Sequence, residues 1–377
     1  MLIGVPKEIK NRENRVGLTP ESVEELVAAG HQVWVQTNAG QGINASDDDY
    51  LAAGASIADT AAEIFAAAEM IVKVKEPQAV ERAMLREGQL LFTYLHLAPD
   101  AEQTTDLVRS GATCIAYETI TSERGGLPLL APMSEVAGRM SIQAGSHALE
   151  NMQGGRGMLL GGVPGVAPAK VVVIGGGVVG SNAVQMALGA RADVVVLDRS
   201  KDALVRIDQE FNGAVKTIYS TKAALQQHVS DADLVIGSVL IPGATAPKLV
   251  TAEMVAGMKK GAVLVDVAID QGGCFATSRA TTHEQPTYDV DGVVHYCVAN
   301  MPGGVPLTST YALNNATLPY VMKLANMGWR AALAGDRHFR AGLNVHSGMV
   351  TNKHVADALG YDYVDPASVC VELEAVA

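Results

Sequence analysis

Three glycines in the middle of the chain follow an apolar run at a fixed spacing. Gly175, Gly177 and Gly180 form a G-x-G-x-x-G pattern directly after the run KVVVI. In such a pattern the first glycine allows a tight turn, the second lets the backbone approach a pyrophosphate, and the third lets a helix pack closely on a strand. We therefore expect a strand, a turn and a helix whose N-terminus binds the phosphates of a dinucleotide.

A carboxylate stands at the distance from this turn that a ribose-binding acid requires. Asp198 ends the run VVVLD, 18 residues after Gly180. A carboxylate there accepts hydrogen bonds from ribose hydroxyls and repels a 2′-phosphate, which favours NAD over NADP. Arg199 and Lys201 lie close by and weaken that preference. The alternative is a glycine turn that binds no nucleotide, and the strand, helix and acid around it make this the weaker interpretation.

A second carboxylate follows another apolar run. In open α/β sheets ligands bind at the carboxyl ends of the strands. Asp270 closes the run AVLVDVAID and precedes the turn residues QGG, so its carboxylate is a candidate for proton transfer in the cleft. Asp266 lies between two valines of the same run, which predicts a buried structural carboxylate or a helix cap.

Four basic side chains in the first third of the chain could bind and convert an anionic substrate. His96 lies near the end of the apolar run QLLFTYLHLA, Lys73 and Lys75 share one face of IVKVK, and Arg15 lies in NRENRVGLTP. Taken singly, each has a structural explanation: a core histidine, a solvated strand edge and a surface charge. Taken with Asp270, they have the chemistry that a carboxylate-bearing substrate needs, because cations hold it and a His and an Asp transfer protons near neutral pH.

The elements that must position these residues follow an α/β order. Before about residue 130, short β-type runs alternate with helical segments, which predicts a mostly parallel sheet. One of these helices is expected to have Thr19 as N-cap, Pro20 at its first position and Gly30 at its end. Ser134 is expected to cap a helix that reaches about Asn151, at a junction between domains.

After residue 170 the pattern of strands and helices repeats. Six buried-strand runs with helical material between them predict a doubly wound sheet of two mononucleotide-binding halves, complete near Asn300. The tail STYALNNATLPYVMKLANMGWRAALAG indicates one or two helices, and its periodicity does not decide whether it returns to the first domain.

Composition limits the classes of ligand and compartment. The chain has 377 residues, 48% hydrophobic residues and a formal net charge of −12. It has no Lys/Arg-rich run, so nucleic acid is an unfavourable ligand. The four cysteines form no C-x-x-C pair, ligand spacing indicates no metal site, and no signal peptide begins the chain, so we expect a reducing, cytoplasmic location. The uncharged stretch 171–190 is better explained by a strand, turn and helix than by a membrane span.

Long ordered motifs carry a resemblance to a known family. These are GVPKEIKNRENRVGLTP, VKVKEP, LFTYLHLA, APMSEVAGRMS, VVVIGGGVVG, VDVAIDQGGC and HYCVANMPGGVPLTSTYALNNATLPY. With them the chain resembles the alanine dehydrogenase family over essentially its whole length. The resemblance implies an enzyme that converts L-alanine, water and NAD⁺ to pyruvate, ammonium and NADH.

The resemblance also assigns roles to residues. It places substrate binding on Arg15 and Lys75, and catalysis on His96 and Asp270. The contacts to NAD that it implies fall on Ser134, Gly175, Gly177, Val178, Val179, Gly180, Asp198, Ser220, Val239, Leu240, Val267, Ala268, Ile269, Asp270, Arg279, Val298, Ala299, Asn300 and Met301. At Ala203 the chain departs from relatives that often carry a basic residue near the adenosine, which bears on cofactor affinity.

The family's architecture explains why the glycine turn is central. It implies an α/β fold of two domains, in which a Rossmann dinucleotide-binding domain (residues 129–305) is inserted into a discontinuous α/β substrate domain (residues 1–128 and 306–377). It also implies a homohexamer. The leading alternative is the NAD-binding subunit of a proton-translocating transhydrogenase, which shares the fold and a similar start. An opine- or saccharopine-type dehydrogenase and a non-catalytic NAD sensor are further alternatives, and the sensor leaves Arg15, Lys75, His96 and Asp270 unexplained as a set.

Overall fold

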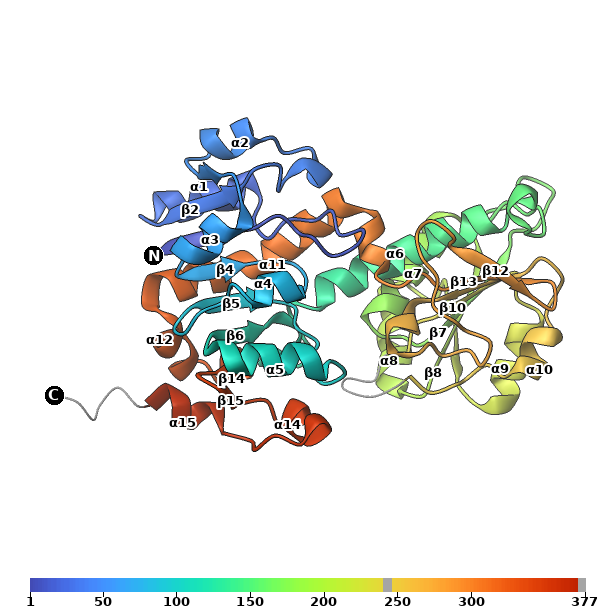
Figure 1. Ribbon diagram of the computed structural model, residues 1–377. Coiled ribbons are helices and arrows are strands. Elements are labelled where there is room, and N and C mark those ends of the chain that lie inside the picture. The colour runs from blue at the N-terminus through green and yellow to red at the C-terminus, as the bar shows by residue number, and fades with distance from the viewer. Residues whose placement is uncertain (240–245, 372–377) are drawn as a thin grey trace. The chain divides into compact units, whose positions relative to one another are not determined.

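The computed structural model describes residues 1–239 and 246–371 and divides into two compact units. Unit 1 is discontinuous and consists of Met1–Met133 and Val305–Ala377, whereas unit 2 is the continuous segment Ser134–Gly304 (Figure 1). Each unit is built on its own sheet. None of the helices in the described ranges combines the length and the apolar character that crossing a membrane requires.

Unit 1 contains an eight-stranded sheet to which both of its segments contribute. Its order is β15-β14-β6-β5-β4-β1-β2-β3. The strands are β1 Leu2–Val5, β2 Gln32–Gln36, β3 Ser56–Ala58, β4 Met70–Val72, β5 Leu90–Thr93, β6 Thr113–Ala116, β14 Leu343–His346 and β15 Met349–Val350. The first six strands pair in parallel, β14 pairs antiparallel with β6, and β15 pairs with β14 at the edge (Figure 1).

The helices of unit 1 connect and cover these strands. They are α1 Pro20–Ala28, α2 Asp47–Ala52, α3 Ala61–Ala67, α4 Ala79–Arg82, α5 Ala101–Ser110, α11 Pro306–Met327, α12 Trp329–Ala334, α13 Arg337–Arg340, α14 Lys353–Leu359 and α15 Pro366–Val371. The Thr19 hydroxyl accepts a hydrogen bond from the Ser22 N–H, which confirms the predicted N-cap of α1. Asn314 of α11 accepts from the Thr19 N–H at 2.9 Å and donates to the Gly17 carbonyl at 3.1 Å. The C-terminal segment thus holds the start of the chain through side-chain hydrogen bonds.

Unit 2 contains a seven-stranded sheet of order β12-β13-β11-β10-β7-β8-β9. The strands are β7 Lys170–Ile174, β8 Asp193–Asp198, β9 Lys216–Tyr219, β10 Leu234–Gly237, β11 Val263–Asp266, β12 Thr287–Val290 and β13 Val293–Tyr296. Six of them pair in parallel, and only β12 runs antiparallel. Numbered within the unit, the parallel strands have the order 3-2-1-4-5-6 of a doubly wound dinucleotide-binding fold. The predicted α/β class is therefore confirmed.

Apolar side chains fill both faces of this sheet. Val171 and Val173 of β7 pack in one buried cluster with Ala183, whereas Val172 packs in the cluster on the other face. Burial on both faces explains why β7 is a continuous apolar run rather than an alternating one. The helices of unit 2 are α7 Val178–Gly189, α8 Lys201–Glu210, α9 Lys222–Ser230 and α10 Ala252–Ala256. Helix α6, Ala131–Ala148, begins three residues before the boundary between the units.

Some elements differ from the sequence-based expectations. The expected six strands of unit 2 are joined by β12, which pairs with β13 across a turn at Asp291 and Gly292. Both turn residues have positive φ, +53° and +75°, as a two-residue Asp-Gly hairpin requires, so the dipeptide was the signal for the missed strand. The tail 309–335 forms the two helices α11 and α12, which confirms the prediction of one or two helices, but β14 and β15 after it were not expected. Short β3 was likewise not expected.

Candidate active site

The glycine turn of unit 2 links β7 to α7. Gly175 has a φ of +104°, which a residue with a side chain rarely adopts. A Cβ on Gly180 would lie 1.9 Å from the Gly175 carbonyl oxygen, so only glycine permits this approach of helix to turn. A Cβ on Gly177 would meet nothing within 4 Å, and Gly177 provides no side-chain cap for α7. An uncapped helix N-terminus beside open space is the arrangement that binds a pyrophosphate, so the turn fits a dinucleotide.

Asp198 lies at the carboxyl end of β8 and contacts this turn. Its carboxylate accepts the Gly176 N–H at 2.6 Å and the Ser200 N–H at 2.7 Å. The Arg206 guanidinium donates to the Gly176 carbonyl. The Cβ of Ala203 lies 3.5 Å from where a Cβ on Gly176 would be. Ala203, at which the chain departs from its relatives, therefore faces the turn. Both backbone polar groups of Gly176 are thus bound by side chains of β8 and α8.

A serine that the sequence analysis did not identify also holds the turn. The Ser238 hydroxyl, which is buried after β10, donates to the carbonyls of Ile174 and Gly175, both at 2.9 Å. The neighbouring Val239 is half-buried, and the predicted contact Leu240 lies outside the described residues. The signal for Ser238 was its place after an apolar run, at the carboxyl end of a parallel strand.

Asp266 and Asp270 lie in different surroundings, as predicted, but Asp270 does not lie in the strand in which it was predicted. Strand β11 ends at Asp266, and Val267–Gln271 form a 3-10 helix, so Asp270 does not close the strand as predicted. The Asp266 side chain ends the strand because it caps that helix, accepting the Ala268 N–H at 3.1 Å and also the Cys274 N–H at 2.9 Å. Burial raises the pKa of Asp266, and these hydrogen bonds oppose the shift. Its predicted structural role is confirmed.

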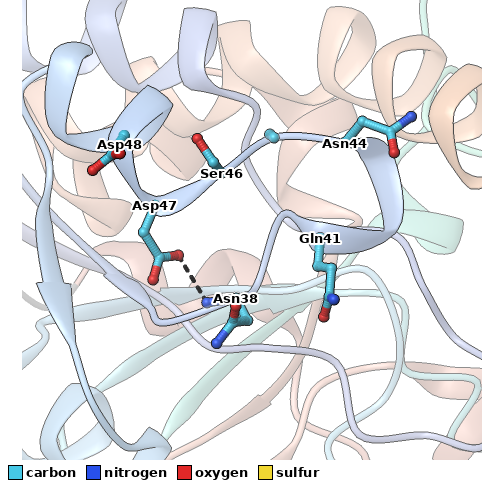
Figure 2. Close-up of a pocket in the computed structure, with 7 residues that line it drawn as sticks. Asn38, Gln41, Asn44, Ser46, Asp47 and Asp48 are labelled. Atoms are coloured by element: carbon cyan, nitrogen blue, oxygen red, sulfur yellow. Dashed lines mark hydrogen bonds between the residues drawn. The ribbon is translucent and has the colours of Figure 1, made fainter.

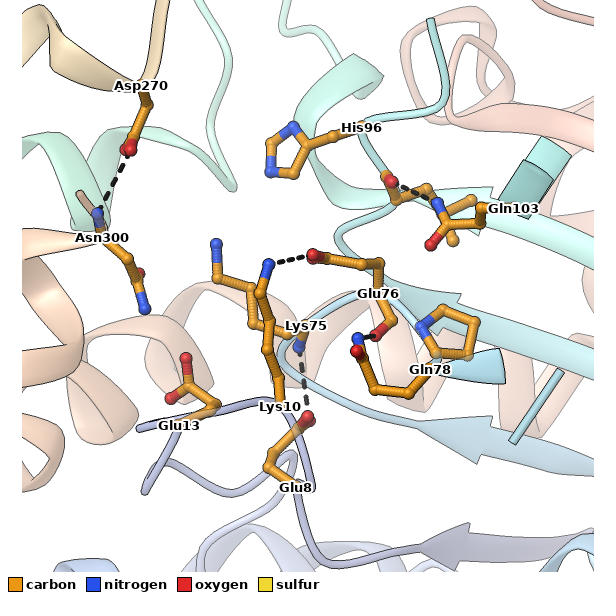
Figure 3. A network of polar contacts seen from close by, with 12 residues as sticks. Glu8, Lys10, Glu13, Lys75, Glu76, Gln78, His96, Gln103, Asp270 and Asn300 are labelled. Carbon is orange, nitrogen blue, oxygen red and sulfur yellow. Dashed lines mark hydrogen bonds and ion pairs between the residues drawn. The ribbon is translucent and has the colours of Figure 1, made fainter. Parts of the chain in front are cut away.

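The Asp270 side chain is exposed, in contrast to that of Asp266. Its Oδ1 accepts the Asn300 N–H at 3.2 Å (Figure 3). Asn300 has a φ of +54°, so this bond helps to hold a left-handed backbone in the loop after β13. An accessible carboxylate on a fixed turn can exchange protons with a bound molecule.

The predicted cofactor residues lie mainly at one edge of the sheet of unit 2. They follow the carboxyl ends of six parallel strands, which meet at the same edge. After β7 come Gly175, Gly177, Val178, Val179 and Gly180; Asp198 ends β8; Ser220 follows β9; Val239 follows β10; Val267, Ala268, Ile269 and Asp270 follow β11; and Val298, Ala299, Asn300 and Met301 follow β13.

Two predicted cofactor residues lie elsewhere in unit 2. Arg279 is exposed between the 3-10 helix and β12, with its guanidinium carbon 3.9 Å from the centre of the Tyr288 ring. Ser134 is the fourth residue of α6 rather than its N-cap. The expected cap is wrong because Pro132 fits the first turn of a helix, where its missing N–H is not needed, and the Ala131 N–H bonds the Leu127 carbonyl.

In unit 1, Arg15 is a buried cation rather than a surface charge. It is 2% exposed, and its Nε and Nη2 donate to the two carboxylate oxygens of Glu13, both at 2.6 Å. Its Nη1 lies 3.0 Å from the Met133 sulfur. Burial would raise the pKa of Glu13, but the hydrogen bonds and charge of Arg15 outweigh burial, so the pKa of this carboxyl lies below its ordinary value. The side chain that could grip a substrate carboxylate is therefore oriented by a fork of two parallel hydrogen bonds.

Lys73 and Lys75 do not share a solvated strand edge, because β4 ends at Val72. Lys73 is fully buried, and its ammonium lies 3.0 Å from a Glu8 carboxylate oxygen and 2.7 Å from one of Glu81. Burial works against the ammonium charge, but the two carboxylates overcome it and raise the pKa of Lys73. The expected surface lysine is thus wrong for this position.

Lys75 is half-buried and its backbone is fixed by the same Glu8. A Glu8 carboxylate oxygen accepts the Val74 N–H at 2.7 Å and the Lys75 N–H at 3.3 Å (Figure 3). Burial would raise the pKa of Glu76. An ion pair with Lys10 and the charge of Lys75 outweigh burial and lower this pKa. These acidic partners were not predicted, although Glu8 and Glu13 lie in the same motif as Arg15.

His96 lies beyond the end of β5, with 46% of its side chain exposed. It is therefore not a core histidine.

A small cavity of about 120 Å³ is lined by charged residues of unit 1, among them Glu8, Glu13 and Arg15. A wider hollow of about 480 Å³ is lined by polar residues near Asn38 and Asp47 and contains none of the candidate residues (Figure 2). Among the described residues no cluster of His, Cys, Asp or Glu has the arrangement of a metal site.

Comparison with known proteins places this arrangement in a family. The model described as "Alanine dehydrogenase/PNT, N-terminal domain" matches residues 4–137, and that described as "Alanine dehydrogenase/PNT, C-terminal domain" matches residues 141–353. The chain belongs to the alanine dehydrogenase/PNT family. This family membership agrees with the resemblance that the sequence motifs indicate.

Relatives within alanine dehydrogenase/PNT are similar over nearly the whole chain. The alanine dehydrogenase of Halomonas elongata is 62% identical over 98% of this chain and 100% of its own length. That of Mycolicibacterium smegmatis is 55% identical over 97% and 99%. A solved L-alanine dehydrogenase has a TM-score of 0.93 at 52% identity, covering 96% of this chain and 99% of its own.

The transhydrogenase branch of alanine dehydrogenase/PNT is more distant from this chain. A transhydrogenase structure from Sinorhizobium meliloti has a TM-score of 0.83 at 25% identity, over 93% of this chain and 100% of its own. The prediction of an oxidoreductase of the alanine dehydrogenase type is therefore confirmed over the transhydrogenase alternative. A nicotinamide dinucleotide is the cofactor that this fold and family imply.

Proposed function

We propose that this chain catalyses the reversible reaction of L-alanine, water and NAD⁺ to pyruvate, ammonium and NADH. The observation that carries the proposal is the glycine turn with Asp198, which has the form of a dinucleotide site in a chain with relatives named alanine dehydrogenase. NAD is favoured over NADP because the Asp198 carboxylate repels a 2′-phosphate. When bound, NAD supplies a two-electron acceptor at nicotinamide C4.

Unit 2 holds the dinucleotide in this proposal. The N-terminus of α7, at Val178 and Val179, binds the pyrophosphate, and Asp198 binds the adenosine ribose. The remaining cofactor residues at the strand ends, with Ser134 and Arg279, contact the rest of the molecule.

Unit 1 holds the substrate through its cations. Arg15 binds the substrate carboxylate with the guanidinium that Glu13 orients, and Lys75 binds the carboxylate or the developing carbonyl oxygen. Burial would lower the pKa of Arg15, but the hydrogen bonds and the charge of Glu13 outweigh burial and raise it, so the guanidinium remains charged at neutral pH. Two cations offset the charge that the substrate brings into the site.

Proton transfer falls to His96 and Asp270. The substrate ammonium must lose a proton before the bond to hydrogen at Cα is oxidised, and the water that replaces nitrogen must lose protons as well. An imidazole nitrogen of His96 and a carboxylate oxygen of Asp270 take these protons, and one of them returns a proton to the departing ammonia. Groups that alternate between base and acid suit a reaction that runs in both directions.

Absorbance at the NADH band tests the reaction. Purified protein with L-alanine and NAD⁺ at alkaline pH is expected to form NADH, and pyruvate with ammonium is expected to consume it. NADP⁺ in place of NAD⁺ serves as the control for Asp198 and is expected to give no turnover. NADH binding without turnover in either direction would contradict the proposal.

Asp270→Asn tests the proton-transfer role. The amide oxygen keeps an acceptor for the Asn300 N–H, so the turn is expected to stay in place. We expect normal NADH affinity by fluorescence titration and a kcat lower by about 10²–10⁴-fold, the usual contribution of a general acid or base. Asp208→Asn, on the exposed face of α8, is the matched control and should leave kcat unchanged. A wild-type kcat for Asp270→Asn would remove Asp270 from the mechanism.

The assembly and the compartment remain part of the proposal. The family resemblance implies a homohexamer, whereas the cysteine pattern predicts a cytoplasmic location. Sedimentation at several protein concentrations measures the first, and cell fractionation measures the second.

A further inference from the structure

The backbone of His96 adopts a conformation that few residues with side chains tolerate. Its φ is +51°, in the left-handed region, three residues after β5 ends. Such a residue persists only where the surrounding structure holds it, and such strain is found most often at functional sites. The contacts around His96 therefore indicate what fixes its side chain.

The first of these contacts is the carboxylate of Glu118, from the 3-10 helix Tyr117–Thr119 that follows β6. It accepts the Leu95 N–H at 3.2 Å and the His96 N–H at 2.6 Å. Strands β5 and β6 pair in parallel, so their carboxyl ends bring Glu118 next to the turn. One side chain thus satisfies two consecutive N–H groups of the strained turn.

The same carboxylate is also close to the imidazole ring. Oε1 of Glu118 lies 3.9 Å from Nδ1 of His96. The carboxylate is half-buried, with 13% of its side chain exposed, so solvent screens it only in part. A carboxylate beside Nδ1 favours the tautomer that carries its proton on that nitrogen, which leaves Nε2 for proton exchange.

Two further side chains hold the turn. Buried Gln103 of α5 donates from Nε2 to the Leu95 carbonyl at 2.6 Å, so both polar groups of Leu95 are bound (Figure 3). The ring of Tyr94 stacks on the imidazole, with centroids 5.7 Å apart and planes 6° apart. The Tyr94 hydroxyl donates to the Leu129 carbonyl, which fixes the ring on which His96 stacks.

We propose that Glu118 is the positioning residue for His96, and that Gln103 and Tyr94 complete the support. The inference rests on the proposed catalytic role of His96. Glu118 holds the turn that aims the imidazole and sets the proton on Nδ1, without touching the substrate. A misplacement of about 1 Å at a catalytic group costs on the order of 100-fold in rate, so such support is worth a large factor.

Glu118→Gln tests the inference because it keeps the size of the side chain and removes its charge. The amide oxygen can still accept both N–H groups, as Oε1 of Glu118 does, but the negative charge is lost and an NH₂ group takes the place of Oε2 beside the Leu95 N–H. We expect kcat to fall about 100-fold. The KM for L-alanine and the affinity for NADH are expected to stay within a factor of two or so, since neither Arg15, Lys75 nor unit 2 is changed.

A double-mutant cycle with His96→Ala separates positioning from general structural damage. If Glu118 acts through the imidazole, Glu118→Gln should cost nothing further in kcat once the imidazole is absent. The same loss in both backgrounds, or a wild-type kcat for Glu118→Gln, would overturn the inference. Glu123→Gln, on the exposed loop five residues later, is the matched control and should leave kcat unchanged.

Gln103→Leu provides a second test should Glu118→Gln not fold. It removes only the bond to the Leu95 carbonyl, and it should lower kcat about tenfold in the wild type and not at all in His96→Ala. Failure of the proposed function gives a different result, since the wild type itself would then not turn over. Failure of the catalytic role of His96 would leave His96→Ala with the kcat of the wild type. The inference on Glu118 alone fails when His96→Ala is impaired and both supporting variants are not.

Discussion

The glycine turn of unit 2 and the cationic cluster of unit 1, which consists of Arg15, Lys73 and Lys75, provide positive charge for anions in opposite ways. The turn presents backbone N–H groups by removing side chains, since a Cβ on Gly180 has no room and one on Gly177 would meet nothing. The cluster presents charged side chains, and buries carboxylates such as Glu13 and Glu8 to hold them. The first arrangement depends on local backbone conformation, whereas the second depends on partners from several segments.

This difference sets what each region tolerates. Backbone N–H groups at a helix N-terminus carry only partial charge and need no counter-ion. A buried guanidinium or ammonium needs its carboxylate, because an unpaired charge in the interior is strongly destabilising. A substitution in the cluster should therefore affect stability, whereas a substitution in the turn should affect mainly the binding of the cofactor.

The largest expected effect is on stability, from Glu13→Gln. The variant removes the Glu13 carboxylate from the side chain of Arg15, which is 1% exposed, and breaking such a buried pair costs about 3–5 kcal/mol. Urea denaturation measures this loss in the free energy of unfolding. Asp357→Asn is the control, since its ion pair with Lys353 is exposed and is worth less than about 0.5 kcal/mol. Equal losses in the two variants would break the comparison.

The next effect is on cofactor binding, from Gly180→Ala. The new Cβ must displace the Gly175 carbonyl, 1.9 Å away, and we expect NADH affinity to fall about 100-fold, or roughly 2.7 kcal/mol. Gly189→Ala in the same helix is the control, because its Cβ would meet nothing within 4 Å. It should keep the affinity and add about 0.5–1 kcal/mol of stability. Fluorescence titration and thermal unfolding measure the two quantities.

The smallest expected effect is a dependence of the free energy of unfolding on pH, and it arises from the cationic cluster alone. The pKa of Glu13 in the folded chain lies below its ordinary value of 4.5, so its stabilisation is complete above pH 4.5 and is lost as the pH falls through the folded pKa. The gap in unfolding free energy between wild type and Glu13→Gln should be constant from pH 7 to pH 5.5 and narrow below that. A gap that stays constant to pH 3 would show that the charge of Glu13 contributes nothing.

The strand pattern of unit 2 could be predicted because each buried strand is an apolar run. The ends of elements were predicted less accurately than the strands themselves. Strand β11, for example, ends at Asp266 because this side chain caps the following 3-10 helix. The antiparallel strand β12 was missed although Asp291 and Gly292 signal its hairpin. The strands that follow the helical tail were missed because β14 pairs with β6, more than 200 residues earlier.

In the candidate site, residue types were predicted better than their surroundings. Arg15 and Lys73 were compatible with exposed positions by their type alone, yet both are buried with carboxylates. Glu118 carried no sequence signal for a role beside His96, from which it is 22 residues away in the chain. Such partners can be found only when the strands that carry them are placed side by side.

By itself the sequence determined the glycine turn, the acid after β8 and the α/β class, because these depend on local backbone conformation and on the spacing of apolar runs. The tertiary structure decided which cations are buried, which carboxylates hold them and how the backbone of His96 is supported. The physical reason is that charges in the interior require partners, and here a partner such as Glu8 lies 65 residues from Lys73 in the chain.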